Sequence, residues 1–158
     1  MELSTKGRYA VMAMVDLALN SPAPGSTGRS VNLGEIAERQ EISQSYLEQL
    51  FARLRRRGLV ESARGPGGGY RLATTPEEIS IGAIMQAVEE PLKVTRCDAH
   101  TRAGCLSGNR RCMTHDLWDE LSRHISQFLG AVTLADVLAR QLPGKADEIA
   151  RYNRAAAQ

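Results

Sequence analysis

The chain has 158 residues, of which 42% are hydrophobic and 24% are charged, a composition typical of a globular protein and not of a disordered chain. Aromatic residues make up only 4%, which is too few for a surface on which the bases of a single-stranded nucleic acid stack. No apolar run approaches the roughly 18 residues that span a bilayer, and the first residues do not form a secretory signal. We therefore expect a cytoplasmic protein with no membrane partner.

The formal net charge is only +2, but the charged residues are unevenly distributed. Residues 50–73 contain six arginines and one acid, Glu61, which gives this segment a local net charge of +5. The three cysteines are also clustered, because all of them lie between residues 97 and 112. Thiols stay reduced in the cytoplasm, so we interpret these cysteines as ligands or reactive groups and not as disulfide partners.

The first half of the chain has the pattern of a helix-turn-helix followed by a hairpin. Asn32 with Glu35 three residues later is a capping signal, and Gly-rich residues separate two short apolar runs. Two helices joined by a tight turn, with a hairpin after the second, are typical of a winged helix-turn-helix. The predicted elements are helices over 8–19 and 33–39, a third helix from Ser43 or Ser45 to about Arg57, and strands over 59–63 and 70–73.

The second half has a different pattern, with a long polar loop between two helices. The predicted elements are a short helix over 81–89, a loop over 92–113 and one long helix over 114–141, which Pro143-Gly144 ends. A loop of this length inside a domain is usually functional or disordered. The fold class we expect is mostly α with a small β-hairpin wing, extended by a long dimerisation helix.

The third helix has one apolar face and one face suited to double-stranded DNA. On a helical wheel Leu47, Leu50, Phe51 and Leu54 fall together. The opposite side carries Ser45, Gln49, Ala52 and Arg56, with Arg53 about 60° beyond. Hydroxyl, amide and guanidinium groups are those that read base edges and hold phosphates, so this face predicts DNA binding.

Two further residues have a role beside this face. Glu48 either completes a capping box with Ser45 or, if the helix begins at Ser43, lies next to the reading face, where it meets a cytosine amine or repels phosphate. The sequence alone leaves both alternatives open. Arg64 begins the Gly-rich tip of the predicted wing, from which we expect it to enter the minor groove.

The cysteines share their segment with a histidine, in the order Cys97, Cys105, Cys112 and His115. Three thiolates and an imidazole within 19 residues can surround one metal centre. Zinc accepts such a set, and iron–sulphur clusters accept histidine in place of a thiolate. His100 is a spare candidate ligand. Because arginines surround the thiols, a metal-free redox switch is an alternative.

The long helix carries an apolar stripe along its length. The stripe consists of Leu117, Leu121, Ile125, Phe128, Val132 and Ala135. A helix of this length is about 40 Å long and overruns a domain of about 70 residues, so we expect the stripe to pair two copies of the chain. Winged-helix dimers read two related half-sites.

Three segments of the sequence resemble those of a known family. The segments STKGRYAVMAMVDLA and SQSYLEQLFARLRRRGLVESARGPGGGYRL, and the Cys…Cys…Cys-x2-His pattern ahead of LWDELS, closely resemble the IscR-like iron–sulphur cluster regulators of bacteria. The resemblance covers residues 1 to about 140. The wider family also holds nitric-oxide and iron-response sensors, which makes a sensor with a different cluster the alternative. The cysteine spacing is wider than in the enteric members, and loop 20–31 is longer.

The resemblance implies a homodimeric transcription factor, and not an enzyme, with one 2Fe–2S cluster per subunit held by Cys97, Cys105, Cys112 and His115. It implies that the cluster-loaded form represses the genes for cluster biogenesis, whose assembly machinery supplies the cluster. It implies DNA contacts from Ser45, Gln49 and Arg64, with Glu48 affecting which sites are read. The expected division is a DNA-binding domain over 1–75, a short helix and cluster-binding loop over 76–113, a dimerisation helix over 114–142 and a tail over 143–158.

Overall fold

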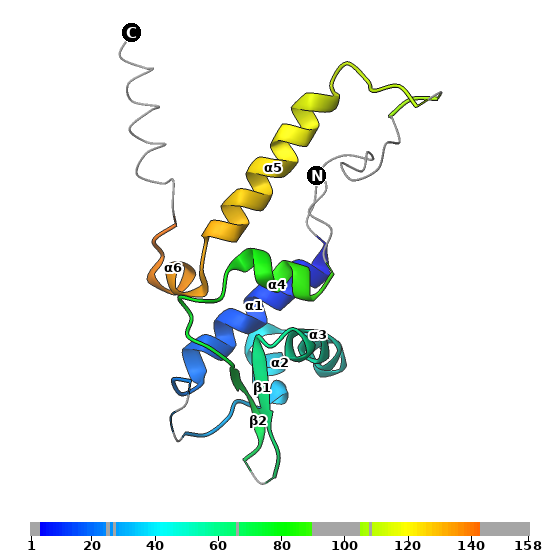
Figure 1. Ribbon diagram of the computed structural model, residues 1–158. Helices are drawn as coiled ribbons and strands as arrows, with labels where there is room; N and C mark the ends of the chain where they lie inside the picture. Colours follow the sequence, from blue (N-terminus) through cyan, green and yellow to red (C-terminus); the bar gives the residue numbers. More distant parts are fainter. Residues whose placement is uncertain are drawn as a thin grey trace.

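The computed structural model describes residues 4–24, 26, 28–65, 67–89, 105–107 and 109–142. In this part of the chain, a helical body carries a two-stranded hairpin at one end, and one helix projects from the other (Figure 1). The mostly helical fold class with a small hairpin is thereby confirmed. The elements are α1 (Thr5–Asn20), α2 (Leu33–Gln40), α3 (Gln44–Arg56), β1 (Val60–Ala63), β2 (Gly69–Leu72), α4 (Ile81–Ala87), α5 (His115–Ala131) and α6 (Leu134–Ala139).

The helix-turn-helix is set by side-chain caps. Asn32 accepts a hydrogen bond from the Gly34 amide at 2.7 Å, and the Glu35 side chain accepts from the Asn32 amide, which completes the expected capping box of α2. Helix α3 begins after Ser43, whose hydroxyl accepts from the Tyr46 amide at 3.3 Å. The alternative start at Ser45 is therefore wrong.

The apolar face of α3 packs into the body against α1, as its wheel predicts. Leu47, Phe51 and Leu54 are fully buried, and Leu50 is nearly so. Helix α1 contributes Ala10, Ala13, Met14 and Leu17 to the same core, all inaccessible to solvent. Burial of each large side chain stabilises the fold by about 1.5–3 kcal/mol, so this contact fixes the orientation of α3.

An ion pair with a buried carboxylate holds α1 against α2. The Asp16 carboxylate is only 3% exposed and accepts hydrogen bonds from Arg39 at 2.6 and 3.0 Å and from Gln40 at 2.7 Å. Burial by itself raises the pKa of Asp16, but the hydrogen bonds and positive charge of these partners outweigh it and hold the pKa below its usual value. The network therefore ties the first helix to the helix-turn-helix.

The wing is a hairpin that a third segment supports. Strands β1 and β2 pair antiparallel from Val60↔Leu72 to Ala63↔Gly69, within one residue of the predicted strands. Val31 adds a bridge to Tyr70, with hydrogen bonds of 2.9 and 2.7 Å. A Cβ at Gly69 would lie 2.3 Å from the Val31 carbonyl oxygen, so only glycine permits this approach. The wing base is thus fixed to the loop that leads into α2.

The single long helix predicted over 114–141 is wrong, because α5 ends at Ala131 and α6 begins at Leu134. Between them Val132 is extended, and Thr133 and Asp136 form a capping box that starts α6. Val132 is 2% exposed and Leu134 is fully buried. The chain turns at this point because burying these two side chains in the body stabilises it more than continuing the helix into solvent.

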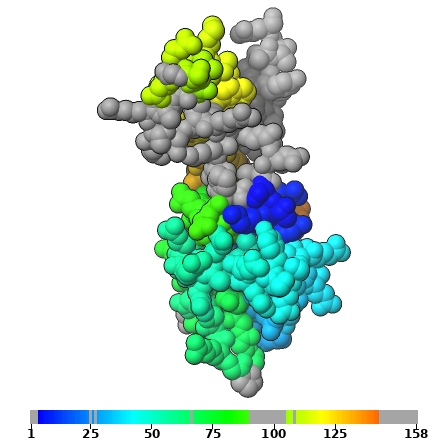
Figure 2. All heavy atoms as spheres, turned by 90° about the vertical axis from the view of Figure 1, so that its right-hand side faces the viewer, coloured from blue at the N-terminus to red at the C-terminus, as the bar shows by residue number. Residues whose placement is uncertain are grey.

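The corner between α5 and α6 is fastened to the residues around α4. Ile81 donates its amide to the Val132 carbonyl at 2.8 Å, and Leu134 donates to the Ile79 carbonyl at 2.9 Å. A Cβ at Gly82 would lie 3.1 Å from the Gly130 amide nitrogen, so the backbones of α4 and α5 approach closely there. In the space-filling view, the residues at and just before the amino end of α5 (yellow-green to yellow) lie at the opposite end from the wing (Figure 2). None of the described helices is long and apolar enough to cross a membrane.

Candidate functional site

The face of α3 opposite the core is accessible, as DNA binding requires. Ser45, Gln49, Ala52 and Arg56 are all exposed, and so is Arg64 at the wing. Phe51 and Tyr70 stack edge to face with ring centroids 4.9 Å apart, which connects the underside of α3 to the wing. The predicted reading residues and the wing arginine thus stand on two elements that pack on one another.

Glu48 lies on the exposed side of α3 and not in a capping box. Its carboxylate accepts a hydrogen bond from the side-chain amide of Gln44 at 3.2 Å. Since the helix begins at Ser43, the geometry agrees with the alternative in which Glu48 lies beside the reading face. A carboxylate beside a DNA-reading face would repel phosphate unless a base donates to it.

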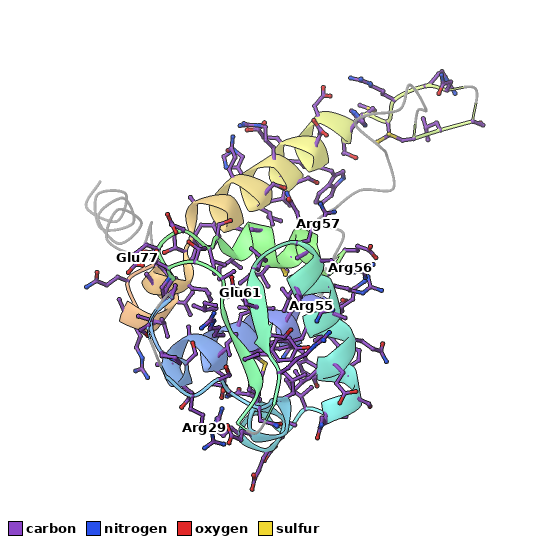
Figure 3. The ribbon with its side chains drawn as sticks, turned by 60° about the horizontal axis from the view of Figure 1, so that its bottom comes forward. Arg29, Arg55, Arg56, Arg57, Glu61 and Glu77 are labelled. Carbon is purple, nitrogen blue, oxygen red and sulfur yellow. The ribbon has the colours of Figure 1, made fainter. Side chains whose placement is uncertain are left out.

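The arginines of the basic segment fall into two groups. Arg53 forms an ion pair with Glu89, Arg71 pairs with Glu61 at 3.0 Å, and Arg55 donates to the Ser62 hydroxyl at 3.2 Å. By contrast, Arg56, Arg57 and Arg64 form no ion pair with another residue in the described ranges. Figure 3 shows Arg55, Arg56 and Arg57 together at the carboxyl end of α3. Unpaired exposed cations are the ones that release counterions from DNA most effectively.

Sequence reasoning missed the partner of Arg53. Glu89 follows α4 and has a left-handed backbone with φ of 57°. Its carboxylate binds Arg53 of α3, and its carbonyl accepts from Lys6 Nζ of α1 at 3.2 Å. The pairing spans 36 positions in the sequence, so no local pattern reveals it. It connects α3 to the residue directly ahead of the segment that contains the first cysteine.

Two of the four predicted metal ligands meet at the amino end of α5. Cys105 Sγ lies 3.2 Å from His115 Nδ1, and both residues are half-buried. The intervening loop is closed by a hydrogen bond from the Leu106 amide to the Arg110 carbonyl, and the His115 amide donates to the Cys112 carbonyl at 3.1 Å. Cys97 and His100 lie outside the described residues.

The third predicted ligand, Cys112, points to another neighbour. Its Sγ lies 3.7 Å from Thr114 Oγ1, which in turn accepts from the Trp118 indole at 3.2 Å. Within the described part of the chain, no group of three or more His, Cys, Asp and Glu side chains is close enough to hold a metal ion. The described residues therefore bring together one thiol–imidazole pair, and a second thiol, Cys112, lies three residues before the histidine of that pair.

The donor atoms fit a metal or an iron–sulphur cluster by their chemistry. Two ligand atoms on one tetrahedral metal lie about 3.5 Å apart, given bonds of about 2.3 Å to sulfur and about 2.0 Å to nitrogen. The 3.2 Å between Cys105 Sγ and His115 Nδ1 is close to that separation. Thiolates and imidazole are the soft and borderline donors that iron–sulphur clusters and zinc accept.

Helix α5 presents a partly exposed apolar side. None of its residues is buried. Leu117 is 61% exposed and Phe128 is 46% exposed, while Leu121 and Ile125 between them are half-buried. Along α5 the predicted stripe therefore exists, but it ends at Phe128, because Val132 belongs to the core of the body.

A basic recognition helix with an attached wing defines the class of this molecule as a winged helix-turn-helix DNA-binding protein. The comparisons narrow the class. A family model named Rrf2 and described as an iron-dependent transcriptional regulator matches residues 3–140. The chain belongs to the Rrf2 family and is a transcriptional regulator, not an enzyme.

Individual relatives agree with this assignment. The HTH-type transcriptional regulator IscR of Yersinia pestis is 51% identical over 144 residues, covering 89% of this chain and 81% of that protein. IscR of Aliivibrio salmonicida is 50% identical over 141 residues, covering 87% and 77%. Among solved structures, IscR of T. potens is 39% identical with a TM-score of 0.67, covering 89% and 88%. CymR, described as the global cysteine regulator of B. subtilis, is 30% identical with a TM-score of 0.69, covering 89% and 98%.

Proposed function

We propose that this regulator senses iron–sulphur supply through one 2Fe–2S cluster per subunit, and that Cys97, Cys105, Cys112 and His115 hold it. The observation that carries the proposal is the approach of Cys105 Sγ to His115 Nδ1 at the amino end of α5. The identity of about 50% to regulators named IscR supports it. Such a cluster, when bound, would be a group whose presence depends on iron, sulphide and oxidants.

The DNA half of the proposal assigns roles to six residues. Ser45 and Gln49 read base edges in the major groove, Arg64 enters the minor groove, and Glu48 selects among sites. Arg56 holds phosphate, and Arg53 does so when it is released from Glu89. Exposure of the first four and of Arg56 supports these roles, as does the packing of the wing against α3.

The dimer completes the mechanism. Two α5 helices pair through the side that carries Leu117, Leu121, Ile125 and Phe128, which sets the spacing of two half-sites. Segment 90–114 joins the DNA-binding body to α5, so binding of a group to its ligands shifts the population of dimer geometries. In this scheme the loaded dimer represses the genes for cluster assembly, and the assembly machinery is the cluster donor.

The experiment is anaerobic purification of the full chain, followed by visible and Mössbauer spectroscopy. We expect the spectra of a 2Fe–2S cluster in the purified protein, and loss of the cluster in the variant His115→Ala. The matched control is His124→Ala, which removes an exposed histidine of α5 that pairs with Glu120 at 2.7 Å. A colourless protein that contains zinc would contradict the proposal.

A metal-free thiol switch is the second candidate, because CymR of Staphylococcus aureus, solved in an oxidised form, is 31% identical with a TM-score of 0.65. A thiol switch does not need an imidazole. Regulation that survives His115→Ala but not Cys112→Ser would therefore favour this candidate. Survival of a differently sized cluster in His115→Ala would instead favour a sensor with another cluster type.

A further inference from the structure

Thr114 occupies the cap position of α5 but does not cap it. In the other described helices, the cap side chain accepts a hydrogen bond from a backbone amide, and the residues that do so are Ser4, Asn32, Ser43, Ser80 and Thr133. Thr114 makes no such bond. A capping threonine usually stabilises its helix by about 1 kcal/mol, and Thr114 does not supply this. Its hydroxyl instead bonds to other side chains.

The Thr114 hydroxyl has two hydrogen-bonding neighbours, the Trp118 indole and the Cys112 sulfur. An indole N–H is a donor only, so Thr114 Oγ1 accepts from Trp118 Nε1, at 3.2 Å. The hydroxyl has one proton, and Cys112 Sγ lies 3.7 Å away. A thiolate that binds a metal has no proton to give and can only accept. When Cys112 binds a metal as a thiolate, the order is therefore indole N–H to hydroxyl oxygen, and hydroxyl proton to Cys112 sulfur.

We propose that Thr114, oriented by Trp118, is a positioning residue that donates a hydrogen bond to the Cys112 ligand sulfur and thereby raises the reduction potential and retention of the bound cluster. This inference rests on the proposed function, in which Cys112 is a ligand. A reduced cluster carries one more negative charge than an oxidised one. A donor to its sulfur therefore stabilises the reduced form more than the oxidised form.

The test uses four variants of the full chain, purified anaerobically. Thr114→Val removes the hydroxyl and keeps the branched shape, and Thr114→Ser restores the hydroxyl. Trp118→Phe keeps a ring but removes the indole donor. Ser126→Ala is the matched control, because it removes an exposed hydroxyl of α5 that donates to the Ser122 carbonyl.

The readouts are the midpoint potential of the cluster, followed by visible circular dichroism in a redox titration, and the rate of cluster loss to a chelator. For Thr114→Val we expect a more negative potential, corresponding to about tenfold less preference for the reduced state, or about 59 mV. We expect cluster loss to be about tenfold faster, which is the usual minimum effect of losing an outer partner. Thr114→Ser and Ser126→Ala should match the original protein.

The outcomes separate this inference from the proposed function. If the original protein holds a 2Fe–2S cluster and Thr114→Val has the same potential and loss rate, the role of Thr114 is refuted and the cluster proposal stands. If the original protein holds no cluster, both are refuted. If Thr114→Val retains no cluster, Trp118→Phe decides. We then expect Trp118→Phe to shift the potential to a more negative value, by less than the roughly 59 mV expected for Thr114→Val, because the indole strengthens the hydroxyl as a donor. An unchanged potential in Trp118→Phe would refute the proposed role of Thr114.

Discussion

The arginines of α3 differ in how much they contribute to DNA affinity, and this difference is measurable. Arg56 is exposed and forms no ion pair with the described residues, whereas Arg53 is one-third exposed and is bound by Glu89. Each phosphate contact adds about 0.9 to the slope of log affinity against log salt concentration. For a dimer on a full site, Arg56→Ala should therefore reduce the slope by about 1.8, from two lost contacts.

Arg53 should behave differently. Its removal also leaves Glu89 without its partner, so Arg53→Ala changes the slope much less than Arg56→Ala. The complementary variant Glu89→Gln frees Arg53 and should steepen the slope by up to about 1.8 in the dimer.

The assay is fluorescence anisotropy with operator DNA at four or more salt concentrations. The control is Arg140→Gly, which removes a cation at the end of α6, where φ is 57° and glycine fits without strain. Equal slopes for Arg53→Ala and Arg56→Ala, with no change in Glu89→Gln, would refute the different roles that we assign to the two arginines.

Three further predictions concern stability, assembly and reading. Asp16→Asn should lower the free energy of unfolding by about 2–3 kcal/mol at pH 7, because the carboxylate bound by Arg39 loses its charge. Since the folded pKa of Asp16 is lowered, its contribution is complete above the unfolded pKa of about 3.9 and is lost as the pH falls through the folded pKa. Urea unfolding should therefore show a smaller difference near pH 3 than at pH 7, and an equal difference would contradict this. Phe128→Asp should convert a dimer to a monomer in sedimentation velocity, whereas Ser126→Asp, on the opposite side of α5, should not; a dimeric Phe128→Asp would count against the proposed interface. Arg64→Ala should cost about 1–3 kcal/mol of operator binding if Arg64 reads bases, and an equal loss on unrelated DNA would show that it only holds phosphate.

Local signals predicted the helix-turn-helix well. The Asn32 cap, the apolar face of α3 and the Gly-rich hairpin each specify structure within a few residues, so each is readable without tertiary information. The start of α3 at Ser43 was left open, because Ser45 with Glu48 has an equally good capping pattern. The hydrogen bond from the Tyr46 amide to the Ser43 hydroxyl decides between the two.

Tertiary contacts account for what the sequence did not reveal. Asp16 and Arg39 are 23 positions apart, and Arg53 and Glu89 are 36 apart, so only the folded chain brings them together. The break after Ala131 has a local signal in the capping box of Thr133 and Asp136. The apolar stripe continues through Val132, however, and this pattern predicts an unbroken helix. The part of the stripe up to Phe128 lies on a partly exposed side of α5, and Val132 belongs to the core.

The magnitudes indicate which connection carries the proposed regulation. Coupling between two binding sites is typically about 1–3 kcal/mol. The ion pair between Arg53 and Glu89 joins side chains that are 33% and 68% exposed. Such a pair contributes only about 0.2–1 kcal/mol, so its breaking accounts for the smaller part at most.

The corner between α5 and α6 is anchored more firmly. It has two backbone hydrogen bonds to residues 79–81, a close approach of Gly82 to Gly130, and the buried side chains of Val132 and Leu134. In the proposed scheme, a displacement at the amino end of α5, where Cys105 lies next to His115, would therefore rotate the helix about its anchored carboxyl end. We propose that in the dimer this turn changes the separation of the two α3 helices, so that cluster occupancy acts on DNA affinity through half-site spacing and not through the ion pair.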